Sequence, residues 1–238
     1  MIVRDNATRS TSKERQQRMV SSSEITSLED PRSLLFQHTV LCQAGLPYRD
    51  PGEEVTRWQR INGNVHLSIS AGVAMDPEKG LVQIGLPFGP KARLILAHLN
   101  GEALRAQSPE IEVEASLTAF VKRLKLDSGG RTINTIKDQL TRLSTANITL
   151  GTVRDGRAVT INSQIVTAFD LWFSKDGCQK FLWPSTLRLS TDYFESLKQH
   201  AVPLHDRALM ALSGNAMALD IYAWLAQRLH RAVNLLKG

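Results

Sequence analysis

The sequence predicts an α+β fold, because a helix, a glycine turn, a second helix and a β-hairpin follow one another across residues 116–163. Apolar residues of the first helix recur at i, i+3, i+4 and i+7, the spacing of one buried helical face: Leu117, Phe120, Val121 and Leu124. Residues 128–130 (Ser-Gly-Gly) interrupt this pattern, and glycine tolerates the positive φ that we expect in a tight interhelical turn. The order of elements is typical of a winged helix-turn-helix, a shape that places one helix in the major groove of DNA.

The second helix, from 131 to about 145, has two unlike faces. Its apolar face carries Ile133, Ile136, Leu140 and Leu143. At 100° per residue the opposite face carries the candidates for base contacts: Arg131, Asn134, Thr135, Asp138 and Arg142. Arginine pairs with guanine and asparagine with adenine in the major groove, and aspartate accepts from cytosine, so this set of side chains suits a recognition helix.

A basic hairpin follows, with strands at 147–150 and 158–161 joined by a turn at Asp155-Gly156. The stretch from 116 to 160 contains eight basic and three acidic side chains, so it holds +5 of the chain's formal net charge of +6. Such a concentration of charge favours a polyanionic partner over the alternative, a solvated face of an ordinary globular domain. The candidates for phosphate contacts are Lys122, Arg123, Lys137, Arg154 and Arg157.

The elements that precede this motif begin after a basic, Ser/Thr-rich tail at 1–30, which we expect to be disordered. A short helix is predicted at 32–43, followed by a loop at 45–52 that proline and glycine punctuate. Alternating apolar residues predict a strand at 64–73, and 81–85 returns as its hairpin partner.

A helix opened by Pro90 is the predicted first helix of the winged domain. Its apolar stripe consists of Ala92, Ile95, Leu96, Leu99 and Ala103. A short strand is expected at 111–113, and two further strands at 165–173 and 181–189.

The last third of the chain is predicted to be mainly helical, with helices at 191–199 and 204–212 and a long one ending near Leu236. One stripe of the long helix aligns Ala218, Tyr222, Leu225, Leu229, Val233 and Leu236. We expect its last four residues to leave an apolar face that favours a homodimer. The predicted organisation is a tail (1–30), a lead-in (31–85), a winged-helix DNA-binding domain (86–185) and an incomplete second winged-helix-like domain (186–238).

Composition and motifs argue against several other classes of protein. The longest apolar runs are too short to span a bilayer, and the two cysteines, Cys42 and Cys178, are read as buried apolar residues in a reducing compartment. The six histidines form no HxxxH or HExxH pair, and no phosphate-binding loop or nucleophile elbow occurs. We therefore expect no catalytic residue, no metal site and no cofactor, and we expect the aromatic residues Trp172, Trp183, Tyr222 and Trp224 to belong to the core.

Several segments together resemble RepA-type plasmid replication initiators over roughly residues 40–232. They are 46–47 (Leu-Pro), 60–64 (Arg-Ile-Asn-Gly-Asn), 86–89 (Leu-Pro-Phe-Gly), 91–97 (Lys-Ala-Arg-Leu-Ile-Leu-Ala), 128–131 (Ser-Gly-Gly-Arg), 138–143 (Asp-Gln-Leu-Thr-Arg-Leu) and 218–225 (Ala-Leu-Asp-Ile-Tyr-Ala-Trp-Leu). Arg131, Asp138, Gln139 and Arg142 match the family's motif around its recognition helix, whereas Asn134 and Thr135 come from the helical wheel alone.

This resemblance implies a non-enzymatic protein of the bacterial cytoplasm that binds double-stranded plasmid origin DNA, helps open it and recruits the host replication initiator and helicase machinery. It also implies a second winged helix beyond 220–225. Since the sequence ends at Gly238, we expect weaker DNA binding than two complete winged helices would give. Two alternatives remain: a transcriptional or replication repressor that binds DNA through the same winged helix, and a protein-interaction module that dimerises and binds little DNA.

Overall fold

The computed structural model of the chain describes residues 33–76, 78–112, 114, 116–154, 156–168 and 186–236. The described residues form seven helices and eleven strands. The helices are α2 (Thr39–Gln43), α3 (Gly89–Ala106), α4 (Leu117–Arg123), α5 (Gly130–Thr145), α6 (Thr191–His200), α7 (Asp206–Ala211) and α8 (Ala216–Leu236). The strands are β1 (Leu34–His38), β2 (Arg57–Asn62), β3 (Val65–Ser70), β4 (Val73–Asp76), β5 (Gly80–Gln83), β6 (Glu110–Glu112), β7 (Asn147–Arg154), β8 (Arg157–Gln164), β9 (Val166–Ala168), β10 (Thr186–Leu189) and β11 (Ala201–His205). The predicted tail, Trp172, Cys178 and Trp183 lie outside the described residues.

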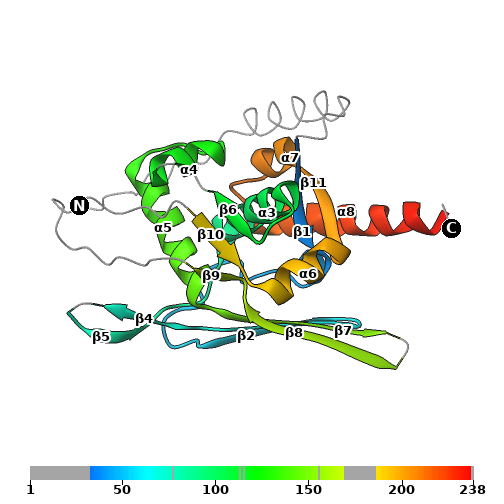
Figure 1. Ribbon diagram of the computed structural model, residues 1–238, viewed down its shortest axis with the longest axis horizontal. Coiled ribbons are helices and arrows are strands. Elements are labelled where there is room, and N and C mark those ends of the chain that lie inside the picture. Colours follow the sequence, from blue (N-terminus) through cyan, green and yellow to red (C-terminus); the bar gives the residue numbers. More distant parts are fainter. Residues whose placement is uncertain are drawn as a thin grey trace, which may run out of the picture.

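A four-stranded antiparallel sheet in the order β2-β3-β7-β8 lies along one side of the molecule (Figure 1). Its register pairs Leu67 of β3 with Leu150 of β7, and the inward-facing apolar residues of these two strands are buried. The hairpin predicted around Asp155-Gly156 is confirmed and is longer than expected, because β7 and β8 each extend to eight residues. Strand β2 was missed, since its exposed Arg57, Gln59 and Ile61 hide the alternation.

The predicted strand at 64–73 is wrong in one respect, because it is two strands, β3 and β4. The chain turns at Gly72, whose position is so close to α5 that an added Cβ would lie 1.9 Å from the carbonyl oxygen of Thr145. The returning segment therefore pairs with β4, with Val73 opposite Gln83, and β4 and β5 form a separate ribbon at one end of the sheet (Figure 1).

Helices α3, α4 and α5 pack together above the sheet. The apolar stripes predicted for them are confirmed: Leu99, Phe120 and Ile136 are fully buried in one core, and Ile133 packs against its edge. Pro90 occupies the first turn of α3, and the Ser116 hydroxyl caps α4 by accepting from the Ala119 N–H at 3.1 Å.

The expected conformation of the α4–α5 turn is wrong at the glycines. Gly129 has φ −66°, and the residue in the left-handed region is Lys125 at φ 54°. The Asp127 carboxylate accepts from the Gly129 N–H at 3.1 Å, so a local side-chain contact shapes the turn.

The helix predicted at 32–43 is also partly wrong, because residues 34–38 form β1 and only α2 is helical. β1 pairs with β11 over five residues, from Leu34 opposite His205 to His38 opposite Ala201. Side chains of α3 donate hydrogen bonds to carbonyl groups of β1: Arg105 donates to the Leu34 carbonyl at 2.9 Å and Asn100 to the Phe36 carbonyl at 3.2 Å. This long-range pairing outweighs the local apolar spacing.

The same pairing shortens the helix predicted at 204–212 to α7, since 201–205 are β11. Pro203 is accommodated because β11 has one strand partner and its free edge needs no N–H. A third sheet, in the order β6-β10-β9, contains the strand expected at 111–113 and the described parts of those expected at 165–173 and 181–189; residues 169–185 lie outside the described residues.

The apolar stripe predicted on α8 is exposed at Leu225 and Leu229, as a face left open for association would be, whereas its Tyr222 packs against the core; the side chains of Val233 and Leu236 lie outside the described part of the structure. Leu219 and Ala223 are buried against α3 and β11, whereas Leu225 and Leu229 are exposed. The helix is apolar on two sides, so helical periodicity alone could not choose between them. Trp224 is 36% exposed, so its expected place in the core is also wrong.

Strand pairing crosses the predicted domain boundaries. The segment 31–85 supplies β2 and β3 to the sheet that contains β7 and β8, and β1 to the pair that contains β11. A buried network joins the same parts: the Tyr193 hydroxyl donates to Asn100 at 3.1 Å, and Asn100 donates to Gln37 at 3.0 Å.

Candidate nucleic-acid interface

The N-terminal half of α5 presents the most accessible of the predicted base-contacting side chains. Arg131 and Asn134 are exposed, one turn apart on the same face. The N-cap residue, Gly129, has no side chain to cap the first turn. The first backbone N–H groups of α5 therefore face outward and, with the helix dipole, favour an anion at this end.

Arg142, at the other end of α5, is held by the protein itself. Its side chain is 16% exposed; Nε donates to Asp138 at 2.9 Å and Nη1 donates to the Leu86 carbonyl at 3.1 Å. The guanidinium also lies over the Phe88 ring, 5.0 Å from its centroid, and next to Gly85, where a Cβ would be 2.4 Å from Nη1. This packing fixes α5 to the segment before α3.

Asp138 and Thr135 are engaged within α5. Asp138 is exposed but accepts from both Arg142 and Gln139, the latter at 2.9 Å. The Thr135 hydroxyl donates to the Arg131 carbonyl at 2.9 Å. These contacts leave Arg131 and Asn134 as the pair best placed to reach an external partner.

Gln139 has a role that periodicity did not reveal. It is 1% exposed, and its Oε1 accepts from the Phe88 N–H at 2.9 Å. Gln139 and Arg142 thus both hold the 86–88 segment against α5. The only sequence signal for this contact was that the two segments appear together in the resemblance.

The predicted phosphate-contacting residues fall into different environments. Lys122 of α4 and Arg157 of β8 are exposed, and Lys137 of α5 is half-buried. Arg123 forms ion pairs with Glu102 at 3.4 Å and Glu114 at 3.7 Å. The backbone of Arg154 pairs with Arg157 at the hairpin end, but the side chain of Arg154 lies outside the described part of the structure.

An acidic loop from a distant part of the sequence lies beside α5. Asp50 approaches Arg142 at 3.5 Å, and Glu53 and Glu54 line one hollow together with Asn134 and Lys137. The loop brings three carboxylates alongside α5 between Asn134 and Arg142, where the segment 116–160 on its own is basic. An anionic backbone is therefore accommodated better at the first turn of the helix, around Arg131.

Two other features are absent from the part of the chain that the structure describes. Its residues contain no group of three or more His, Cys, Asp or Glu side chains that could hold a metal ion. None of its helices combines the length and apolar character needed to cross a bilayer. Cys42 is buried, as predicted, and burial raises the pKa of its thiol.

Comparisons with known proteins give a family and a similar fold. The family model described as plasmid encoded RepA protein matches residues 86–235. The crystal structure of domains 2 and 3 of RctB (selenomethionine derivatives) is similar in fold, with a TM-score of 0.50 and 9% identity over 81% of this chain and 74% of that one. A second RctB structure, of domains 2-3, has a TM-score of 0.42 and 11% identity over 67% of this chain and 58% of that one. No curated protein matches the sequence.

Proposed function

The chain belongs to the family of plasmid-encoded RepA proteins, and from this premise we propose that it is a replication initiator that binds double-stranded origin DNA sequence-specifically. It acts by binding DNA, without catalysing a reaction and without a cofactor. It acts in the bacterial cytoplasm on its own plasmid, and host initiator and helicase machinery are its proposed protein partners.

The proposed reading head is a winged helix built from α3, β6, α4, α5 and the β7–β8 hairpin. The order of these elements supports it, as do the exposed Arg131 and Asn134 on the second helix of the helix-turn-helix. In this arrangement α5 enters the major groove and the basic hairpin, with Arg157 exposed near its end, lies along the adjacent backbone.

The single observation that carries the proposal is the contrast along α5. Arg131 and Asn134 are exposed beside an uncapped helix N-terminus, whereas the Arg142 side chain is 16% exposed and bonded internally. We propose that Arg131 and Asn134 contact bases, with Thr135 at the edge of the contact. Asp138 and Arg142, which were also candidates for base contact, position α5 and the 86–88 segment.

The test is binding of the purified chain to fluorescently labelled origin fragments of its own plasmid and to shuffled duplexes of equal length, over a series of salt concentrations. A preference for the origin of at least about 1,000-fold, with affinity falling steeply as salt rises, is the expected result. Equal and weak binding to both duplexes would contradict the proposal.

A self-associating protein is the second candidate, because the solvent face of α8 is apolar. Met217, Ile221, Leu225 and Leu229 are each about half-exposed or more. Burial of such a face against a second copy is the simplest way to remove it from water. Sedimentation of the wild-type chain and of Leu225→Glu/Leu229→Glu tests it: only the wild type should dimerise, and a monomeric wild type rejects this candidate.

A further inference from the structure

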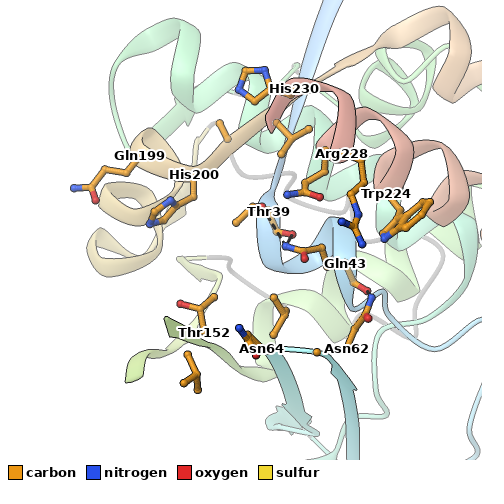
Figure 2. Close-up of a pocket in the computed structure, with 16 residues that line it drawn as sticks. Thr39, Gln43, Asn62, Asn64, Thr152, Gln199, His200, Trp224, Arg228 and His230 are labelled. Carbon is orange, nitrogen blue, oxygen red and sulfur yellow. Dashed lines mark hydrogen bonds between the residues drawn. The ribbon is translucent and has the colours of Figure 1, made fainter. Parts of the chain in front are cut away.

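A second concave surface lies between α8 and the β2–β3 turn, and no residue of α4 or α5 lines it. Two hollows, of about 760 and 350 Å³, have Gln43, Asn62 and Trp224 in common and so form one continuous groove. Figure 2 shows the larger hollow, with Arg228 and Trp224 of α8 on one side, His200 of α6 on another, and Asn62 and Asn64 of the β2–β3 turn below.

The groove has a positive and hydrogen-bonding lining. Arg60 and Arg228 are its cationic side chains, and His200 and His230 add further nitrogen donors or acceptors. Asp220 is the one carboxylate that lines either hollow in the described part of the chain, and its charge is already matched by Arg93 at 2.6 Å. The lining therefore favours an anionic ligand.

Both arginines of the groove lie over aromatic rings. The Arg228 guanidinium is 5.1 Å from the centroid of Trp224, and the Arg60 guanidinium is 5.2 Å from that of Tyr48. Trp224 is 36% exposed, so part of its indole surface is open to a flat, apolar partner. An exposed aromatic ring beside a guanidinium is the pairing that stacks a nucleic-acid base and contacts its phosphate.

One buried side chain in the larger hollow lacks a partner. Gln227 is 6% exposed, and its Oε1 has no hydrogen-bond partner. An orphaned buried acceptor costs free energy unless a ligand donates to it. An unpaired base offers both N–H bonds of its amino group as donors, whereas in a duplex one of them is already used in the Watson–Crick pair.

From these observations we propose that the groove between α8 and the β2–β3 turn binds a single strand of nucleic acid, with one base stacked on Trp224 and phosphates on Arg60 and Arg228. This goes beyond duplex binding by α5: no residue of α4 or α5 lines the groove, although Thr152 and Val153 of the β7–β8 hairpin line its larger hollow. Single-stranded DNA and single-stranded RNA fit the groove alike, because both offer unpaired bases and phosphates.

The test is fluorescence anisotropy of the full chain with labelled 20-nucleotide oligo-dT and oligo-U and with a 20-base-pair duplex. The variants are Trp224→Ala, Arg228→Gln and, as a control, Leu81→Ala, which shortens an exposed apolar side chain of β5 outside both hollows. We expect Trp224→Ala to weaken single-strand binding by at least about fivefold, and Arg228→Gln to reduce its salt dependence. Duplex binding should be unchanged in these variants, Leu81→Ala should bind single strands like the wild type, and the two oligonucleotides show which sugar is preferred.

Three results would overturn the proposal. The wild-type chain fails to bind either oligonucleotide, or it binds them equally well after Trp224→Ala and Arg228→Gln. Alternatively, Arg131→Ala/Asn134→Ala abolishes single-strand binding, which would place it on α5. A labelled Glu- and Leu-rich peptide is tested in parallel. If the peptide binds, Trp224→Ala abolishes that binding and neither oligonucleotide binds, the groove docks an acidic protein segment instead. Loss of duplex binding alone would bear only on the function proposed for α5.

Discussion

Arg93 of α3 and Asp220 of α8 form a bidentate ion pair, with Nε–Oδ1 and Nη2–Oδ2 distances of 2.6 and 2.8 Å. Arg93 also donates to the carbonyl oxygens of Leu46, Pro47 and Gly89, at 2.6, 3.2 and 2.8 Å. Both side chains are largely buried. One guanidinium therefore joins α3, the first helix of the proposed winged helix, to the long last helix and to the loop between α2 and β2.

Removal of one partner of this pair should destabilise the whole fold. Asp220→Ala leaves the Arg93 guanidinium buried without its counter-charge, and we expect the free energy of unfolding to fall by about 3–5 kcal/mol. Urea unfolding followed by circular dichroism measures it. Glu195→Gln, which breaks the exposed pair with Lys198, is the matched control and should change stability by less than about 1 kcal/mol. A similar fall in the free energy of unfolding in both variants would show that the buried pair contributes no more to stability than the exposed one.

Gly45 should tolerate no side chain, for a related reason. A Cβ at this position would lie 2.1 Å from Asp220 Oδ2, so Gly45→Ala must displace the carboxylate from Arg93. We expect the free energy of unfolding to fall by about 2 kcal/mol or more. Gly214→Ala, whose Cβ would meet nothing within 4 Å, is the control. Equal urea midpoints for the two variants would rule out the close contact.

Arg131 and Arg142 should respond differently to truncation, although both are arginines on one helix. Arg142→Ala removes the bonds to Leu86 and Asp138 and should lower the free energy of unfolding by about 1–3 kcal/mol. Arg131→Ala, at an exposed position, should change it by less than about 0.5 kcal/mol. If urea unfolding gives the reverse order, the positioning role of Arg142 is wrong.

The acidic loop beside α5 should weaken binding to any duplex. Glu53→Gln/Glu54→Gln removes two negative charges near Asn134 and Lys137, so we expect tighter binding to origin and shuffled duplexes alike. The gain should shrink as salt rises. Glu110→Gln/Glu112→Gln removes two exposed charges from β6 and serves as the control. Unchanged or weaker binding by the α5-side variant would contradict this electrostatic reading.

Two buried histidines should make the protein less stable in acid. Burial lowers the pKa of His38 to about 3, and burial lowers that of His98 to about 4 despite the nearby Glu102 carboxylate. Below pH 6.5 the unfolded chain binds protons that the folded chain does not bind. The free energy of unfolding should therefore fall as the pH drops from about 6.5 towards 4, by up to about 1.4 kcal/mol per pH unit for each histidine.

Urea unfolding at pH 7.5, 6.5 and 5.5 measures this slope. His38→Gln/His98→Gln should flatten it, whereas His66→Gln, at an exposed position, should leave it unchanged. A wild-type chain whose stability is constant across this range would show that the buried histidines do not control it.

The parts of the fold that the sequence predicted well are those in which neighbours along the chain decide burial. The stripes of α3, α4 and α5 repeat at helical spacing, so Leu99, Phe120 and Ile136 could be assigned to the core in advance. Residues 34–38 could not be recognised as a strand, because their partner lies more than 160 residues away. For α8, apolar residues on both sides left the choice of buried face to tertiary contacts.

The candidate site was predictable to a similar degree. The helical wheel correctly separated the polar and buried faces of α5, but it could not show that Arg142 turns back towards Leu86. The acidic loop was invisible for the same reason, since Asp50 is 92 residues before Arg142. Several segments that carry the family resemblance contact one another: 138–143 contacts 86–89, and Arg93 contacts Asp220 and the 46–47 carbonyls.

The central claim, that the N-terminal half of α5 reads the origin, is tested most directly by Arg131→Ala/Asn134→Ala. Its affinities for the origin fragment and for a shuffled duplex are measured at one salt concentration and compared with those of the wild type. We predict that the preference for the origin falls by about 30-fold or more while binding to the shuffled duplex changes little, because two base contacts are lost and most phosphate contacts remain. An unchanged preference, in a variant with wild-type stability, would show that origin recognition lies elsewhere on the protein.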